Sequence, residues 1–175
     1  MSRVLYEHFQ LPQIFTAVQL DVTTTPAMWQ LEGYTNIDHQ VQALVGMTVP
    51  DRGRVTKLGT ERLVWFGRDR YFLTTQRQDL HDSDGLYVTN QTYSRAQILI
   101  EGEAARSLLA RGLPIDVADA AFAVSDVKHS HINHIGVTVI RNHDNAGSPI
   151  FELWVMRGFA KSLMDFLLRS AATLC

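Results

Sequence analysis

The sequence has a single cysteine, Cys175, among its 175 residues. One thiol excludes an internal disulfide framework and gives a thiolate metal site one ligand at most. A basic surplus is also missing, because Lys and Arg total 16 against 18 Asp and Glu. Neither nucleic acid nor an anionic membrane surface is therefore an expected partner.

Long hydrophobic runs are missing as well. No apolar run approaches the length of about 18 residues that a membrane helix needs, and residues 1–15 carry Glu7 and His8 instead of the continuous apolar stretch of a signal peptide. We therefore expect a cytoplasmic protein. Hydrophobic residues make up 46% and charged residues 19% of the chain, which is typical of a globular protein with a packed core.

The sequence also contains no glycine-rich phosphate loop of the dinucleotide-binding or Walker type. Such loops bring backbone N–H groups close to a phosphate, so a nucleotide cofactor bound by this chain alone is not expected. We predict a chain without a cofactor of its own.

The first half of the chain predicts strands followed by a helix and a hairpin. Alternating apolar residues at 18–22, and a second run at 28–31, indicate two strands. A helix is expected from Ile37 to Val45, with Asn36 as N-cap and Gly46 as C-terminal stop. The runs 62–66 and 71–74 predict a hairpin, followed by a short helix over 78–82.

The second half repeats this order. Strands are expected at 86–89 and 97–100, followed by a helix with Ala105, Leu108 and Leu109 on one face. A second hairpin is predicted from 131–140 and 150–155. The last helix is expected over 159–174, with an inward face formed by Phe159, Leu163, Phe166 and Leu167.

Both halves therefore have the order strand, Glu-Gly, helix, hairpin, helix, with QLEG at 30–33 and LIEG at 99–102. We interpret this as a duplication; the alternative is that the order is common in α+β proteins and the Glu-Gly pairs coincide by chance. The predicted fold class is α+β, with mixed or antiparallel sheets and helices on one face. The predicted division is an N-terminal arm (1–17), a first β-α-β-β-α unit (18–84) and a second unit (85–175), which share one core in one compact globule.

Three stretches carry a family resemblance. They are VTNQT at 88–92 followed by ILIEG at 98–102, ARSLLARGLPID at 105–116, and FELWVMRGFAKSL at 151–163, with LVWFG at 63–67 as a weaker match. Together they resemble gamma subunits of heterotetrameric sarcosine oxidase. Two positions depart from the family, which usually has an acidic residue at Asn90 and a serine at Gly158, and these leave room for a related demethylating complex.

The resemblance implies the fold of the folate-binding aminomethyltransferases, the glycine-cleavage T-proteins. It implies a non-catalytic gamma-type subunit in a flavoenzyme complex that demethylates sarcosine or another methylated amine. FAD, FMN, NAD and tetrahydrofolate would then belong to the partner subunits, and the partners would be larger flavoprotein chains. No catalytic, cofactor-binding or metal-ligating residue is assigned to this chain.

Several residues are candidates for chemistry of their own. His129, His131 and His134, with His143 further on, offer imidazoles for a metal ion, because His129 and His131 would face the same side of a strand. No carboxylate or cysteine stands at a helpful spacing, so we interpret them as ordinary strand side chains.

The other candidates also have simpler interpretations. The loop 51–54, with Arg52 and Arg54, would suit an anion, but a solvated loop explains it. A triad of Ser94, His129 and Asp126 has no nucleophile-elbow sequence around the serine. Three arginines would suit ion pairs across a subunit boundary, but weak local ion pairs are the simpler role. Three tryptophans would suit the wall of a pterin site, but core packing is the simpler role. The arginines are Arg95, Arg106 and Arg157, and the tryptophans are Trp29, Trp65 and Trp154.

The N-terminal arm is apolar without a regular pattern, and Pro12 interrupts any helix. Its large apolar residues either fold back on the chain's own sheet or form part of a surface for another subunit, and the resemblance favours the subunit surface. An isolated chain would then self-associate. These residues are Leu5, Tyr6, Phe9, Leu11, Ile14 and Phe15.

Two rival functions remain at this point. The first is a free-standing folate-binding protein related to the aminomethyltransferases, which would need a pocket carboxylate where Asn90 stands. The second is a structural or regulatory module without a metabolic role, for which the sequence has no positive feature.

Overall fold

The computed structural model describes residues 8–23 and 27–174. By contacts the chain divides into two compact units, one made of residues 1–24 and 94–175 and the other of residues 25–93. We call them the outer unit and the inner unit, after their positions in the sequence. Each has one antiparallel sheet and its own cluster of buried apolar residues, so the predicted α+β class with antiparallel sheets is confirmed.

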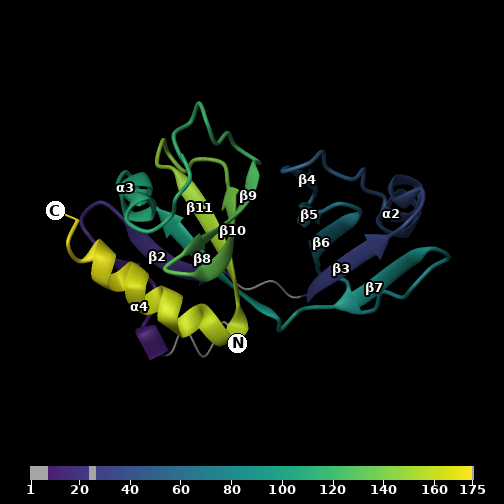
Figure 1. The fold of residues 1–175 in the computed structure, drawn as a ribbon, viewed down its shortest axis with the longest axis horizontal. Helices are drawn as coiled ribbons and strands as arrows, with labels where there is room; N and C mark the ends of the chain where they lie inside the picture. Colours follow the sequence, from purple (N-terminus) through teal and green to yellow (C-terminus); the bar gives the residue numbers. More distant parts are fainter. Residues whose placement is uncertain (1–7, 24–26, 175) are drawn as a thin grey trace. The chain divides into compact units, whose positions relative to one another are not determined.

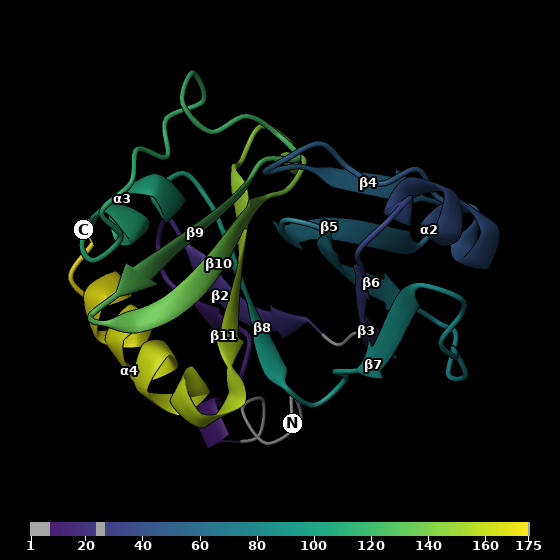
Figure 2. The same cartoon turned by 45° about the vertical axis from the view of Figure 1, so that its right-hand side comes forward.

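The inner unit contains β3 (Ala27–Gly33), α2 (Ile37–Val45), β4 (Val55–Leu58), β5 (Glu61–Gly67), β6 (Arg70–Thr75) and β7 (Leu86–Asn90). Its sheet has the order β4-β5-β6-β3-β7. The helix α2 lies on one face of this sheet (Figure 2) and packs Ile37, Val41 and Val45 into the cluster that holds Leu31 and Leu73.

The outer unit contains β1 (Gln13–Ile14), β2 (Gln19–Thr23), β8 (Arg95–Glu101), α3 (Ala105–Ala110), β9 (Val127–Ile132), β10 (Ile135–Arg141), β11 (Ile150–Met156), the 3₁₀ turn η1 (Arg157–Phe159) and α4 (Ala160–Ala171). Its sheet has the order β1-β2-β8-β11-β10-β9. Both helices cover the same face of the sheet (Figure 1), where Leu108 and Leu163 join Ile98, Val139 and Leu153 in the core.

The two sheets share one strand order. The inner order β4-β5-β6-β3-β7 corresponds strand for strand to β9-β10-β11-β8-β2 in the outer unit. Glu32-Gly33 ends β3 before α2, and Glu101 ends β8, with Gly102 directly after it and before α3. Each carboxylate accepts a hydrogen bond from the hairpin of its own unit. Glu32 accepts one from Arg70, at the start of β6, at 2.7 Å, and Glu101 accepts one from the Asn145 side-chain amide, between β10 and β11, at 2.7 Å. These equivalences support the duplication that the sequence indicated.

The flanking strand of each sheet comes from the other half of the sequence. β2 pairs with β8, placing Leu20 opposite Ile100, and β7 pairs with β3, placing Val88 opposite Leu31. The compact units therefore differ from the expected ranges 18–84 and 85–175, and the structure has two apolar clusters where we expected one core. The physical reason is that each flanking strand buries its apolar residues against the sheet of the other half.

Three local predictions were wrong. Residues 78–82 form a loop, in which the Asp82 carboxylate accepts the Val88 N–H at 2.6 Å. Residues 127–141 form two strands, β9 and β10, around a tight turn with positive φ at Asn133 and His134. Phe159, expected to face inward, is 52% exposed. Asn36 is the N-cap residue of α2 as predicted, although it has φ 50° and its side chain makes no capping hydrogen bond.

The described part of the N-terminal arm packs on its own unit. Leu11 is 3% exposed in the outer core, and Phe9 and Phe15 pack against that core, whereas Ile14 on β1 is 73% exposed. Leu11, Phe9 and Phe15 therefore fold back on the chain's own sheet, the first of the two alternatives for the arm. Leu5 and Tyr6 lie outside the described residues.

Candidate functional site

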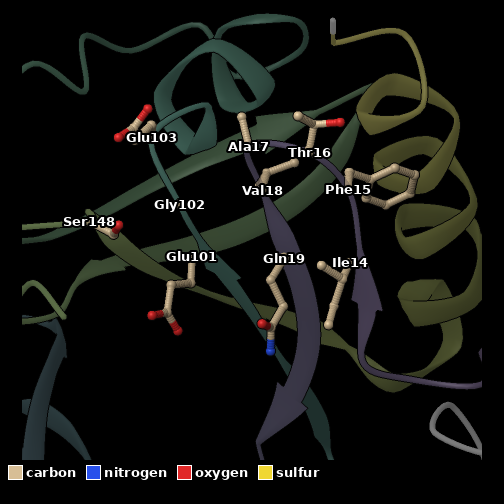
Figure 3. A pocket seen from close by; sticks show the side chains of 10 residues that line it. All are labelled: Ile14, Phe15, Thr16, Ala17, Val18, Gln19, Glu101, Gly102, Glu103 and Ser148. Carbon is tan, nitrogen blue, oxygen red and sulfur yellow. The ribbon is translucent and has the colours of Figure 1, made fainter. Parts of the chain in front are cut away.

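A pocket of about 380 Å³ opens where the arm passes over the turn between β8 and α3. We call it the arm pocket; Figure 3 shows the ten residues around it. They are Ile14, Phe15, Thr16, Ala17, Val18, Gln19, Glu101, Gly102, Glu103 and Ser148. All ten belong to the outer unit.

Gly102 is the residue that lets the arm approach the turn so closely. Its φ is +131°, and a Cβ at this position would lie 2.4 Å from the Ala17 carbonyl oxygen and 2.9 Å from the Val18 Cα. The Ala17 carbonyl accepts the Ala104 N–H at 3.0 Å, and the Gly102 N–H bonds the Pro149 carbonyl at 3.2 Å. Only glycine fits both the dihedral angle and the space.

The chemistry of the arm pocket is acidic. Gln19 and Glu101 are register partners on β2 and β8, and their side chains extend from the same face of the two strands (Figure 3). Glu101 is held by Asn145, and Glu103 adds a second carboxylate. The hydroxyls of Thr16 and Ser148 complete a polar lining, which has hydrogen-bonding capacity but pairs no nucleophile with an imidazole base.

The histidine candidates lie along the edge strand β9. His129 and His131 are opposite Thr138 and Gly136 of β10, on one face of the strand as the spacing predicted. His134 lies in the β9–β10 turn with φ 66°. The described residues, 8–23 and 27–174, contain no group of three or more His, Cys, Asp or Glu side chains arranged to hold a metal ion.

His129 has a structural partner. Its Nδ1 lies 3.0 Å from the Thr138 hydroxyl. Desolvation by the surrounding strands, and to a lesser degree the charge of Arg95, lower the pKa of His129. The neutral imidazole is therefore the form that the fold favours.

This lowered pKa predicts an acid-sensitive contribution to stability. The unfolded state binds a proton near pH 6.5, whereas the folded state resists it, so stability should fall as pH drops below that value. Replacing His129 by asparagine should flatten the loss of stability between pH 7 and pH 5. Urea unfolding at several pH values measures this, with His131→Asn as the matched control on the same face. Parallel pH profiles for His129→Asn and the wild type would contradict the prediction.

The triad of Ser94, His129 and Asp126 is not assembled. The Arg157 N–H donates to the Ser94 carbonyl, so Ser94 lies at the Met156 end of β11. The Asp126 carbonyl accepts the backbone N–H of Arg141, whose register partner is Phe151 at the other end of β11. Phe151 and Met156 are five residue steps apart along β11, about 16 Å at the usual strand rise. The Asp126 carboxylate accepts the Ala123 N–H at 2.8 Å instead.

The arginine candidates have different environments. Arg106 forms an ion pair with Asp119, donates to the Val117 carbonyl at 3.1 Å, and lies 5.9 Å from the centre of the Phe151 ring. Arg157 is exposed in η1. Burial lowers the pKa of Arg95 on β8.

Sequence reasoning missed Arg141, a fully buried cation at the end of β10. It is 1% exposed and donates to the carbonyls of Asn142 at 2.7 Å and Ile150 at 3.2 Å. It also pairs with Asp144 and, at 3.5 Å, with Asp119. Arg141 thus ties two long loops, one before β9 and one after β10, to the end of the sheet. The available signal was an arginine directly after the apolar run of β10.

The tryptophans are buried to different degrees. Trp29 is 6% exposed and donates its indole N–H to the Arg77 carbonyl at 3.0 Å. Trp154 is fully buried and donates to the Glu152 carboxylate at 2.5 Å, and Glu152 also accepts the Asn142 amide at 3.2 Å. Trp65 is half-buried beside Arg52 of the loop 51–54.

The two positions that depart from the family motif are also placed. Asn90 is exposed on β7, where its side-chain oxygen accepts the Thr92 N–H at 3.0 Å. A Cβ at Gly158 would meet no atom within 4 Å, so the serine usual in the family would fit there without strain.

No protein-family model and no curated protein matches the sequence. Solved structures do match. A chain of the heterotetrameric sarcosine oxidase from Corynebacterium sp. U-96, in complex with pyrrole 2-carboxylate, superposes with a TM-score of 0.84 at 17% identity, over 98% of this chain and 93% of that one. Aminomethyltransferase T of the glycine cleavage system from Bartonella henselae superposes with a TM-score of 0.58 at 17% identity, over 94% of this chain and 48% of that one.

The class of protein is therefore defined at the level of the fold. This chain has a T-protein-like α+β fold, shared along nearly its whole length with a chain of heterotetrameric sarcosine oxidase. The resemblance drawn from the sequence motifs is confirmed in these terms. Within the described residues, no helix is both long and apolar enough to cross a membrane.

Proposed function

We propose that this chain is a non-catalytic, gamma-type subunit of a flavoenzyme complex that demethylates sarcosine or a related methylated amine, and that it contributes to assembly of the complex. One observation carries the proposal: the likeness to a chain of heterotetrameric sarcosine oxidase extends over 98% of this chain and 93% of that chain. A likeness over nearly the whole of both chains suits an equivalent subunit better than a shared domain.

The placement of the candidate residues supports a structural role. His129 bonds Thr138, the Asp126 carboxylate bonds a backbone N–H, and Arg106 pairs with Asp119. These side chains fix strands and loops of the outer unit. Under this proposal FAD, FMN, NAD and tetrahydrofolate are held by partner subunits, and the complex works in the cytoplasm.

An exposed aromatic pair supports a partner surface. Tyr34 and Tyr87 of the inner unit are 76% and 54% exposed, and their rings meet edge to face with centroids 6.0 Å apart. Tyrosine is enriched in protein interfaces, because it combines a large apolar ring with a hydroxyl that tolerates water. We propose that this pair contacts a larger flavoprotein subunit.

Co-expression with the products of the neighbouring genes, among which the proposal expects a large flavoprotein chain, tests it. The two chains should elute together in gel filtration, with flavin absorbance belonging to the large chain, while this chain alone should be colourless after dialysis. Replacing both Tyr34 and Tyr87 by serine should weaken the complex at least tenfold, whereas Arg169→Ala, an exposed change on α4, should not. If no complex forms and the isolated chain binds tetrahydrofolate, the free-standing folate binder is the better account.

A further inference from the structure

A second pocket, of about 570 Å³, lies entirely within the inner unit. It forms where the loop 51–54 meets the β5–β6 hairpin, and a register shift between Trp65 and Gly67 breaks the ladder beside it. The volume is within the range of about 300–1,000 Å³ typical of small-molecule sites. We call it the Trp65 pocket.

The walls of the Trp65 pocket are aromatic and apolar. Trp65 is half-buried, Tyr71 is 7% exposed, and Pro50 is buried. The backbone N–H of Trp65 donates to the Arg54 carbonyl at 3.0 Å, which fixes the loop to β5. Desolvation, with the charges of Asp38 and Asp69, raises the pKa of Tyr71, so its hydroxyl remains protonated and available as a donor.

The rim is cationic. The Arg52 guanidinium lies 6.0 Å from the centre of the Trp65 ring, and within the described stretches of the chain it forms no ion pair. Arg68 is 96% exposed and lies 3.4 Å from the Asp69 carboxylate. The lining thus contains two guanidinium groups and one carboxylate, and a guanidinium presents paired N–H donors that match a second carboxylate.

We propose that the Trp65 pocket binds a small planar aromatic or heteroaromatic carboxylate, whose ring packs against Trp65 and Pro50 and whose carboxylate pairs with Arg52 and Arg68. The flat wall selects a flat ring, and the guanidiniums select the anion. All seven residues that line the site belong to the inner unit.

The test uses indole-3-carboxylate as probe and indole as its uncharged counterpart, with the full chain labelled with ¹⁵N. The three tryptophan indole N–H signals are followed by NMR, and Trp65→Phe identifies the Trp65 signal. Indole-3-carboxylate should shift the Trp65 signal and bind at least tenfold more tightly than indole. Arg52→Gln should remove most of this difference while leaving the affinity for indole unchanged.

A filling variant tests the location. Gly67 lines the pocket, and a Cβ there would meet no atom within 4 Å, so Gly67→Leu adds a large side chain to the lining without a clash and should abolish the shift. Gly136→Leu is the matched control, because Gly136 of β10 has equally open surroundings and should leave binding intact. The proposal is overturned if Gly67→Leu binds like the wild type, or if no Trp65 shift occurs at about 5 mM probe, where a site of about 1 mM affinity is mostly occupied.

Discussion

Replacing Gly102 by alanine is expected to lower the free energy of unfolding by about 3 kcal/mol or more. The left-handed dihedral alone costs about 1–3 kcal/mol for a residue with a side chain. The new Cβ would also stand 2.4 Å from the Ala17 carbonyl oxygen, so the arm or the β8–α3 turn must move. Urea denaturation of the isolated chain measures the change.

Two other glycines calibrate this effect. Gly136→Ala adds a Cβ that meets nothing within 4 Å, and it should change stability by less than about 1 kcal/mol. Gly33, the equivalent of Gly102 in the inner unit, has milder surroundings, with the Gly85 carbonyl 3.1 Å from the added Cβ. Gly33→Ala should therefore fall between the two. A Gly102→Ala variant as stable as Gly136→Ala would mean that the arm does not approach the turn as described.

Replacing Arg141 by glutamine is expected to cost about 3 kcal/mol. The change removes bonds from a buried cation to the carbonyls of Asn142 and Ile150 and its ion pair with Asp144, and hydrogen bonds to charged groups contribute about 1.5–3 kcal/mol each. Because Arg141 is 1% exposed, added salt should screen little of this contribution.

Arg169→Gln provides the comparison, because Arg169 is an exposed arginine on α4 and should lose less than about 0.5 kcal/mol. Both variants are measured by urea unfolding at low and high salt. Equal stabilities for Arg141→Gln and Arg169→Gln would show that the loops on either side of β9 and β10 are not held by the buried guanidinium.

The order of elements was predictable from the sequence where local signals agree. The Glu-Gly joints at 32–33 and 101–102 revealed equivalent positions, and the apolar spacing of Ile37, Val41 and Val45 placed α2 correctly. The exchange of β2 and β7 was not predictable, because periodicity shows which face of a strand is buried but not which strand pairs with it.

The missed elements have local causes. The turn at Asn133 and His134 lacks the Asn-Gly or Asp-Gly signal of a tight hairpin, so β9 and β10 were read as one strand. The run 78–82 buries only Leu80, too little apolar surface to hold a helix against a core.

The sites were harder to predict than the fold. Arg52 and Trp65 were each noted in the sequence, but their meeting depends on how the loop 51–54 closes on β5. Arg141 was missed, because arginine is usually exposed and its burial depends on Asp119 and Asp144 from two separate loops.

Native mass spectrometry of the complex purified through a tag on this chain tests the central claim most directly. The account predicts one particle that contains this chain together with a larger flavin-bearing chain in fixed ratio, and an unchanged flavin content after the Tyr34 and Tyr87 substitutions dissociate this chain. Recovery of this chain only as a monomer or as copies of itself, from cells that also produce the flavoprotein, would contradict the subunit function.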